Sequence, residues 1–94
     1  MSDSETIHEG GCQCGRIRYR VTGRPNNTTN CHCTQCRMAG GAAFVTWSEF
    51  PRAHVHFMAD EPHTYRSSDR AERGFCPWCG TTLTFHYLDS DTID

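Results

Sequence analysis

The chain has 94 residues, a hydrophobic fraction of 36% and a formal net charge of −2. This length predicts one domain with a marginal core, of the kind that a metal ion or disulfides usually supplement. The charge argues against nucleic acid as the main partner, because phosphate binding relies on a basic surface. No run approaches the ~20 apolar residues of a membrane span, and the polar start resembles no secretory signal, so we expect a cytoplasmic protein.

In chain order, the sequence predicts a flexible N-terminal tail over residues 1–9 and a single zinc-binding domain over residues 10–94. Pro25–Asn30 predicts a turn, and Thr34–Ala39 has room for one or two helical turns. Short alternating or β-rich segments predict the strands, which are Arg16–Val21, Ala43–Trp47, His54–Phe57, His63–Arg66 and Thr81–Tyr87. The fold class is therefore mainly β, a small domain of short antiparallel strands with little helix.

Ten apolar side chains are expected inside this domain. They are Ile17, Tyr19, Val21, Phe44, Val45, Trp47, Phe57, Phe75, Leu83 and Phe85. His54 and His56 would share one face of a strand, and we expect that face to be solvated.

Seven cysteines form three clusters, and their odd number means that disulfides cannot pair them all. A cytoplasmic chain keeps its thiols reduced, and dense cysteine there indicates metal binding or catalysis. The third cluster, Cys76-Pro77-Trp78-Cys79-Gly80, is typical of a zinc knuckle that supplies two of four tetrahedral ligands. A redox dithiol is the rival interpretation, but no long helix pattern follows the second cysteine.

The first cluster, Cys12-Gln13-Cys14, also offers two sulfurs to one ion and is flanked by glycines. Together with Cys76 and Cys79 it can build a closed four-thiolate site that ties the start of the chain to its far end. Closing so long a loop removes much unfolded-state entropy, and zinc at such sites often supplies the folding free energy. Spacing alone leaves open whether Cys12 and Cys14 join the middle cluster instead.

The middle cluster places Cys31, Cys33 and Cys36 within six residues. Three local thiolates can hold one zinc and leave its fourth position open, as catalytic sites do. Two alternatives remain. In one, His32 is the fourth zinc ligand and closes the site; in the other, the three cysteines are spare thiols that hold no second ion. An open three-thiolate zinc is a poor Lewis acid for hydrolysis but suits a fourth thiol, which loses its proton on binding and becomes a nucleophile. The pattern therefore favours chemistry at the sulfur of a small thiol.

Five segments together resemble the glutathione-dependent formaldehyde-activating enzyme family, which also contains centromere protein V. They are G-G-C-Q-C-G-R-I-R-Y (Gly10–Tyr19), C-H-C-T-Q-C-R (Cys31–Arg37), G-A-A-F (Gly41–Phe44), Ser67-Ser68, and R-G-F-C-P-W-C-G-T-T-L (Arg73–Leu83). The resemblance covers most of the chain, and three cysteine clusters in the right order make it specific.

The resemblance implies a zinc-stapled β-tent fold with two zinc ions per chain. It assigns the structural zinc to Cys12, Cys14, Cys76 and Cys79, and the second, catalytic zinc to Cys31, Cys33 and Cys36. The implied activity is that of a carbon–sulfur lyase, with condensation of formaldehyde and glutathione to S-hydroxymethylglutathione as the type reaction. A non-enzymatic zinc-binding interaction module is the alternative, as centromere protein V suggests.

One departure from the family pattern concerns the end of the chain. Family members usually continue with further strands beyond the Gly-Thr-x-Leu segment, so we expect a short or truncated member. A missing strand would leave a sheet edge that a second copy could cover, which makes a homodimer an expectation.

Overall fold

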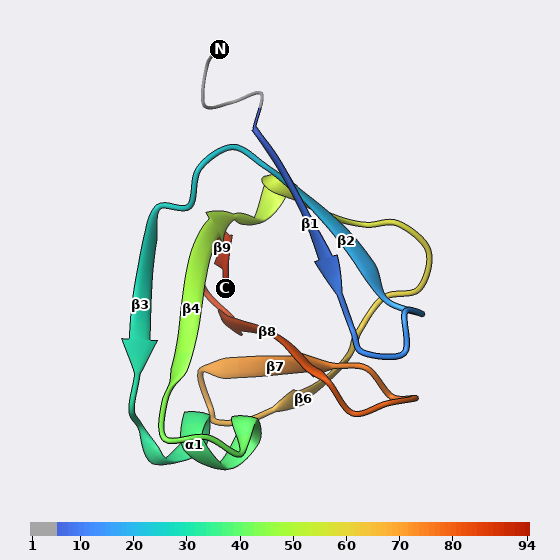
Figure 1. The fold of residues 1–94 in the computed structure, drawn as a ribbon. Helices are drawn as coiled ribbons and strands as arrows, with labels where there is room; N and C mark the ends of the chain where they lie inside the picture. Colours follow the sequence, from blue (N-terminus) through green and yellow to red (C-terminus); the bar gives the residue numbers. More distant parts are fainter. Residues whose placement is uncertain (1–5) are drawn as a thin grey trace.

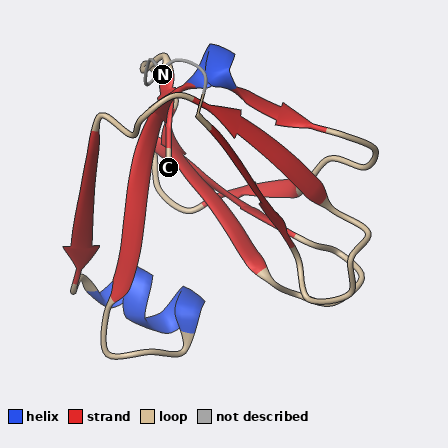
Figure 2. Cartoon of the chain, turned by 45° about the horizontal axis from the view of Figure 1, so that its top comes forward, coloured by secondary structure: helices blue, strands red, loops and turns tan. Residues whose placement is uncertain are grey.

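A computed structural model describes residues 6–94, which form three small antiparallel sheets and one short helix (Figures 1 and 2). The sheets have the strand orders β1-β2-β5, β3-β4-β9 and β6-β7-β8. The strands are β1 (Ile7–Gly11), β2 (Arg18–Thr22), β3 (Asn27–Cys31), β4 (Val45–Pro51), β5 (Val55–Phe57), β6 (His63–Arg66), β7 (Ala71–Phe75), β8 (Thr82–Tyr87) and β9 (Thr92–Ile93). The mainly-β prediction is confirmed.

The helical parts are small. Helix α1 spans Thr34–Gly40 and ends at Gly41, whose φ of 61° lies in the left-handed region that glycine adopts readily. A 3₁₀ turn, η2, spans Arg52–His54 and leads into β5. No helix within residues 6–94 is long and apolar enough to cross a membrane.

The five predicted strands and the short helix are present. Their ends shift by at most two residues, except that the strand predicted to end at Trp47 continues to Pro51. Two expectations about other segments are wrong. The tail does not extend to Glu9, because β1 begins at Ile7 and pairs with β2 along its whole length; residues 1–5 lie outside the described part. Asn27–Asn30 is not a turn but most of β3, which pairs with β4 from Asn27 opposite Glu49 to Cys31 opposite Val45.

The interior is thin, as the low hydrophobic content predicts. Ile17, Val21 and Trp47 are buried, while Phe44 is 44% exposed, against the expectation, because its ring stacks on His32 at the surface. The other six predicted core residues are all intermediate in exposure; they are Tyr19, Val45, Phe57, Phe75, Leu83 and Phe85. His54 and His56 are exposed as expected, although His54 belongs to η2 and not to a strand.

The most deeply buried cluster contains cysteine sulfur. Cys12, Ile17 and Cys76 are each at most 2% exposed and pack together, with Phe57, Cys79 and Leu83 around them. Apolar contacts alone are therefore few here, and whatever holds these cysteines together also holds the core together.

Candidate functional site

The structure gathers the seven cysteines into two groups, all as free thiols. The sulfurs within each group lie within 4.8 Å of one another. The first group, called the four-cysteine cluster, consists of Cys12, Cys14, Cys76 and Cys79; the second, called the three-cysteine cluster, consists of Cys31, Cys33 and Cys36. This grouping is the one that the sequence favoured, and the alternative in which the first two cysteines join the middle cluster does not occur.

Two loops that are distant in sequence form the four-cysteine cluster. The β1–β2 loop and the β7–β8 loop lie side by side on the right in Figure 1. The Sγ atoms of Cys14 and Cys76 are 3.8 Å apart although the residues are 62 positions apart, and the Gln13 amide donates to Thr81 Oγ1. The Arg16 guanidinium lies 4.0 Å from the centre of the Trp78 ring and adds a cation–π contact between the loops.

Both loops turn on a glycine directly after their second cysteine. Gly15 and Gly80 have φ of 86° and 81°, which side chains with a Cβ rarely adopt. The turns aim backbone amides at sulfur: Ile17 N donates to Cys12 Sγ at 3.3 Å and Cys79 N donates to Cys76 Sγ at 3.4 Å. Such donors stabilise thiolates.

The thiol of Cys79 has a pKa lowered to about 5. The main causes are the hydrogen bonds from the Thr81 side chain and backbone, which favour the thiolate; the Thr81 Oγ1 atom lies 3.1 Å from Cys79 Sγ. A thiolate at neutral pH is the form that binds a metal ion.

The three-cysteine cluster lies at the other end of the β6–β8 sheet, next to α1 (Figure 1). Cys31 is the last residue of β3, Cys33 is the N-cap of α1, and Cys36 lies in its first turn. The Cys33 sulfur caps the helix by accepting from the Cys36 amide at 3.3 Å. One tight strand-to-helix connection thus brings three sulfurs together.

Burial differs across this cluster: Cys36 is 3% exposed, Cys31 is intermediate and Cys33 is exposed. Burial would raise the pKa of Cys36, but hydrogen bonds from Arg73 and Trp47 outweigh it and lower the pKa to about 7. Arg73 Nη2 donates to Cys36 Sγ at 3.5 Å. The cluster therefore has a buried, thiolate-favouring side and a side that faces solvent.

No fourth His, Cys, Asp or Glu within residues 6–94 joins the three-cysteine cluster. His32, which could have closed the site, instead stacks its ring on Phe44 at 5.2 Å between centroids. The described side chains thus supply three ligand atoms here and four at the other cluster.

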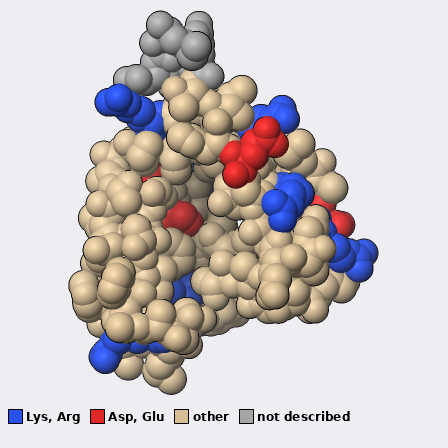
Figure 3. Space-filling view, viewed as in Figure 1, with Lys and Arg blue, Asp and Glu red and all other residues tan. Residues whose placement is uncertain are grey.

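A cavity of about 420 Å³ adjoins the three-cysteine cluster. In Figure 3 the surface is hollowed between the β3–β4 side on the left and the β1–β2 side on the right, and acidic atoms are visible inside the hollow. Cys31, Cys33 and Cys36 line one part of this cavity and Glu49 and Asp94 line another. Burial, and then the nearby Glu49 carboxylate, raise the pKa of Asp94. A second cavity of about 350 Å³, between β2, β4 and β5, contains no cysteine.

The sulfur geometry of the four-cysteine cluster fits zinc. Zinc–thiolate bonds of about 2.3 Å in a tetrahedron place the sulfurs about 3.8 Å apart. The Sγ atoms of Cys12 and Cys14 are 3.5 Å apart and those of Cys14 and Cys76 are 3.8 Å apart. A set of four soft sulfur donors is the ligand type that structural zinc sites use.

Sequence reasoning named every cysteine of the two clusters but not Arg73. This residue is 3% exposed, and it contacts Cys36 and also lies over the Phe85 ring, 5.0 Å from its centre. Arg73 stands in the segment Arg73–Leu83, so it was within a recognised motif. Nothing in that pattern indicates that an arginine three residues before Cys76 turns toward the other cluster.

Comparison with known proteins agrees with this geometry. A family model described as "Glutathione-dependent formaldehyde-activating enzyme" matches residues 7–93. The chain is 35% identical over 82 residues to an "uncharacterized lyase" of Schizosaccharomyces pombe, a match that covers 87% of this chain and 59% of the relative. It is 31% identical over 83 residues to a Halomonas elongata protein named "Putative glutathione-dependent formaldehyde-activating enzyme", covering 80% and 53%. The chain thus spans little more than half the length of these relatives.

Proposed function

This chain belongs to the glutathione-dependent formaldehyde-activating enzyme family, and from that membership and the geometry we propose that it is a zinc-dependent carbon–sulfur lyase acting on glutathione or a related small thiol. One observation carries the proposal. The sulfurs of Cys31, Cys33 and Cys36 meet beside a cavity of about 420 Å³, and no fourth protein ligand within residues 6–94 joins them.

The two clusters have different roles in this proposal. Cys12, Cys14, Cys76 and Cys79 would complete the tetrahedron of a structural zinc. The three-cysteine cluster would hold a second zinc and leave one position facing the cavity. When bound there, zinc supplies a site for a fourth thiol and lowers its pKa, so that the thiol is a thiolate at neutral pH.

The side chains around the cluster fit the handling of a thiolate. Arg73 and the amide of Cys36 donate to the cluster sulfurs and offset their negative charge. The exposed side at Cys33 lets a substrate sulfur approach from solvent. Trp47 and Phe85 line the cavity, and electrostatic contacts are stronger beside apolar walls of this kind than in bulk water.

The reaction proposed for this site joins the thiol to formaldehyde. The thiol gives its proton to solvent, and the sulfur lone pair attacks the carbonyl carbon, so that a C–S bond forms. The π electrons of the carbonyl move to oxygen, which takes a proton from water. The product is the S-hydroxymethyl adduct, and the reverse reaction breaks the same C–S bond. Formaldehyde is small enough to reach a thiolate in a cavity of this volume.

A rate measurement tests the proposal. Purified chain with a measured zinc content is mixed with glutathione and formaldehyde, and the S-hydroxymethylglutathione signal is followed by exchange NMR against a protein-free sample. We expect the unmodified chain to form the adduct faster than the protein-free sample does. The Cys33→Ser variant, which lacks one exposed ligand of the three-cysteine cluster, should lose this acceleration. Two zinc ions per chain with a rate no faster than without protein would reject the lyase proposal and favour an interaction module.

A further inference from the structure

Arg73 is a buried cation that has no carboxylate partner among residues 6–94. Its side chain is 3% exposed, its Nε and Nη1 atoms have no hydrogen-bond partner in this part of the chain, and Nη2 donates to Cys36 Sγ at 3.5 Å. A guanidinium remains protonated in proteins, so it cannot lower the cost of burial by losing its charge. A buried charge of this kind requires an opposite charge nearby.

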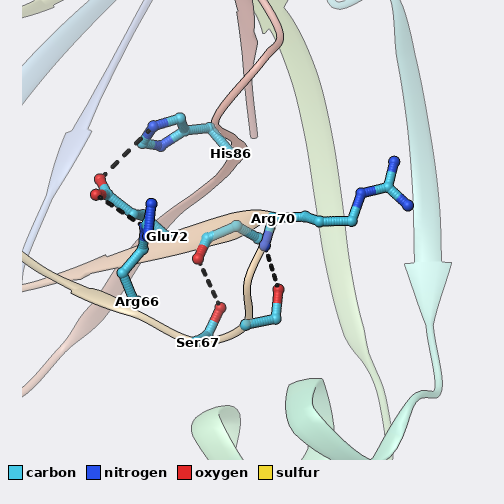
Figure 4. A network of polar contacts seen from close by, with 7 residues as sticks. Arg66, Ser67, Arg70, Glu72 and His86 are labelled. Carbon is cyan, nitrogen blue, oxygen red and sulfur yellow. Dashed lines mark hydrogen bonds and ion pairs between the residues drawn. The ribbon is translucent and has the colours of Figure 1, made fainter.

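The neighbouring acid, Glu72, does not provide that charge. Successive residues of a strand point to opposite faces, so Glu72 and Arg73 of β7 face away from each other. Glu72 is instead engaged by Arg66 of β6 at 3.9 Å and by His86 of β8 at 3.7 Å, as Figure 4 shows. Two carboxylates, those of Glu49 and Asp94, line the same cavity as Arg73, but among residues 6–94 neither forms an ion pair with it. The negative charge that Arg73 contacts directly is therefore that of the three-cysteine cluster.

The position of Arg73 suits a counter-charge better than a substrate anchor. Its side chain lies between the Phe85 ring and the cluster, and its two unpartnered nitrogens are covered by protein atoms. Arg73 lines the cavity, but Nε and Nη1 are buried, so a ligand carboxylate could not pair with both sides of the guanidinium without a rearrangement. The electrostatic field of the guanidinium, in contrast, acts on the cluster over several ångströms in a poorly screened environment.

We propose that Arg73 is the counter-charge of the three-cysteine cluster and that it makes an anionic thiolate, rather than a neutral ligand, the preferred fourth ligand there. This inference rests on the proposed function. Three thiolates around a divalent ion leave one net negative charge, and a fourth thiolate adds another. A fixed buried cation beside Cys36 offsets part of that charge. Arg73 is thus a positioning residue, which acts through the cluster and not on the substrate directly.

The test compares two ligands on cobalt-loaded protein, because Co²⁺ reports its ligands through its visible absorption. The probes are 2-mercaptoethanol, a thiol without a carboxylate, and imidazole, a neutral ligand. Arg73→Met removes the charge at similar volume, Arg73→Lys keeps it, and Arg66→Met is the control. Arg66 is an exposed arginine on the adjacent strand, and its own contact is with Glu72.

We expect Arg73→Met to weaken 2-mercaptoethanol binding roughly ten- to hundredfold, the size of a unit-charge effect at the effective dielectric of a protein. Imidazole binding should change by no more than about twofold on the same reasoning, because a neutral ligand adds no charge. Arg73→Lys should recover most of the thiol affinity, and Arg66→Met should match the unmodified chain. A merely structural role of Arg73 would weaken both ligands together.

Three results would overturn the inference. They are equal loss of both ligands in Arg73→Met, unchanged thiol affinity in that variant, and loss of glutathione binding without loss of 2-mercaptoethanol binding, which would make Arg73 a carboxylate site. If Arg73→Met does not fold, Arg73→Gln is used in its place. Equal thiol affinities in the Arg73→Lys and Arg73→Gln variants would then overturn the inference. An unmodified chain that binds two cobalt ions but no thiol would reject the proposed function itself, a result distinct from these.

Discussion

The two cysteine clusters differ in the way the chain encloses them. The four-cysteine cluster joins two loops 62 residues apart, and two of its cysteines, Cys12 and Cys76, belong to the most buried cluster of the core. The three-cysteine cluster comes from one continuous segment, Cys31–Cys36, and has an exposed member beside a cavity. A site built from distant segments stabilises a fold, whereas a local site beside a cavity can bind and release a ligand without unfolding the chain.

The largest expected effect is that of Cys76→Ser. Structural zinc contributes about 10–16 kcal/mol in zinc-finger peptides, which equals or exceeds the total stability of about 5–15 kcal/mol of an ordinary domain. Cys76 is 0% exposed at the centre of the four-cysteine cluster. We expect this variant to lose cooperative thermal unfolding and its β-sheet circular dichroism signal. A folded variant that has lost only one metal ion would show that the core does not depend on this cluster.

Cys33→Ser is the matched change at the other cluster. We expect the fold to persist, with a stability change below about 1 kcal/mol, because serine is a good N-cap and can replace the sulfur that accepts from the Cys36 amide. Metal content should fall from two ions to one per chain, measured by native mass spectrometry. Global unfolding of this variant would mean that the roles of the two clusters are reversed.

Chelation should separate the clusters in time. An ion held by three cysteines, one of them exposed, is more accessible to a chelator than an ion enclosed by four cysteines in the core. We expect the first zinc equivalent to leave without a change in circular dichroism and the second to leave together with the fold. Loss of the dichroism signal with the first equivalent would contradict this order.

The smallest expected effects are those of two glycines with positive φ. Gly80→Ala forces a Cβ into the left-handed region at the four-cysteine cluster, and Gly41→Ala does so at the end of α1. Each should cost about 1 kcal/mol. Thermal unfolding should therefore shift in both variants, but only Gly80→Ala should speed the release of the slowly chelated ion. If both variants released the slowly chelated ion at the same rate, the turn at Gly80 would have no specific role in holding that ion.

The sequence predicted best those parts of the molecule that depend on local patterns. Five strands show alternation or β-rich composition, and the three cysteine motifs are local, but spacing alone left open whether the first motif joins the third or the middle one. Strand β3 was missed because Asn27–Asn30 is polar and exposed: it is held by its ladder to β4 and by side-chain contacts such as Thr46 Oγ1 to Asn30 Oδ1 at 2.7 Å. A strand that is held by backbone pairing and has no buried face needs no alternation of apolar and polar residues, so its sequence does not reveal it.

Other misses have the same origin in tertiary contacts. Ile7 is 55% exposed, so the hydrophobic pattern of β1 does not distinguish it from a tail, although β1 pairs with β2. Phe44 was expected inside because it is aromatic, but it covers His32 at the surface. Arg73 lies in β7, a segment that the sequence did not predict as a strand. The role proposed for it depends on its burial, its contact with Cys36 and its lack of a carboxylate partner within residues 6–94, which only the three-dimensional arrangement reveals.

The most direct test of the contrast between a closed and an open cluster is zinc X-ray absorption on the two-zinc chain, before and after addition of glutathione. Four sulfurs at one ion and three at the other give an average of about 3.5 sulfurs per zinc. We predict that value without thiol and an increase to about four when glutathione binds the open position. An average of four sulfurs before glutathione is added, or no change on its addition, would contradict the open site.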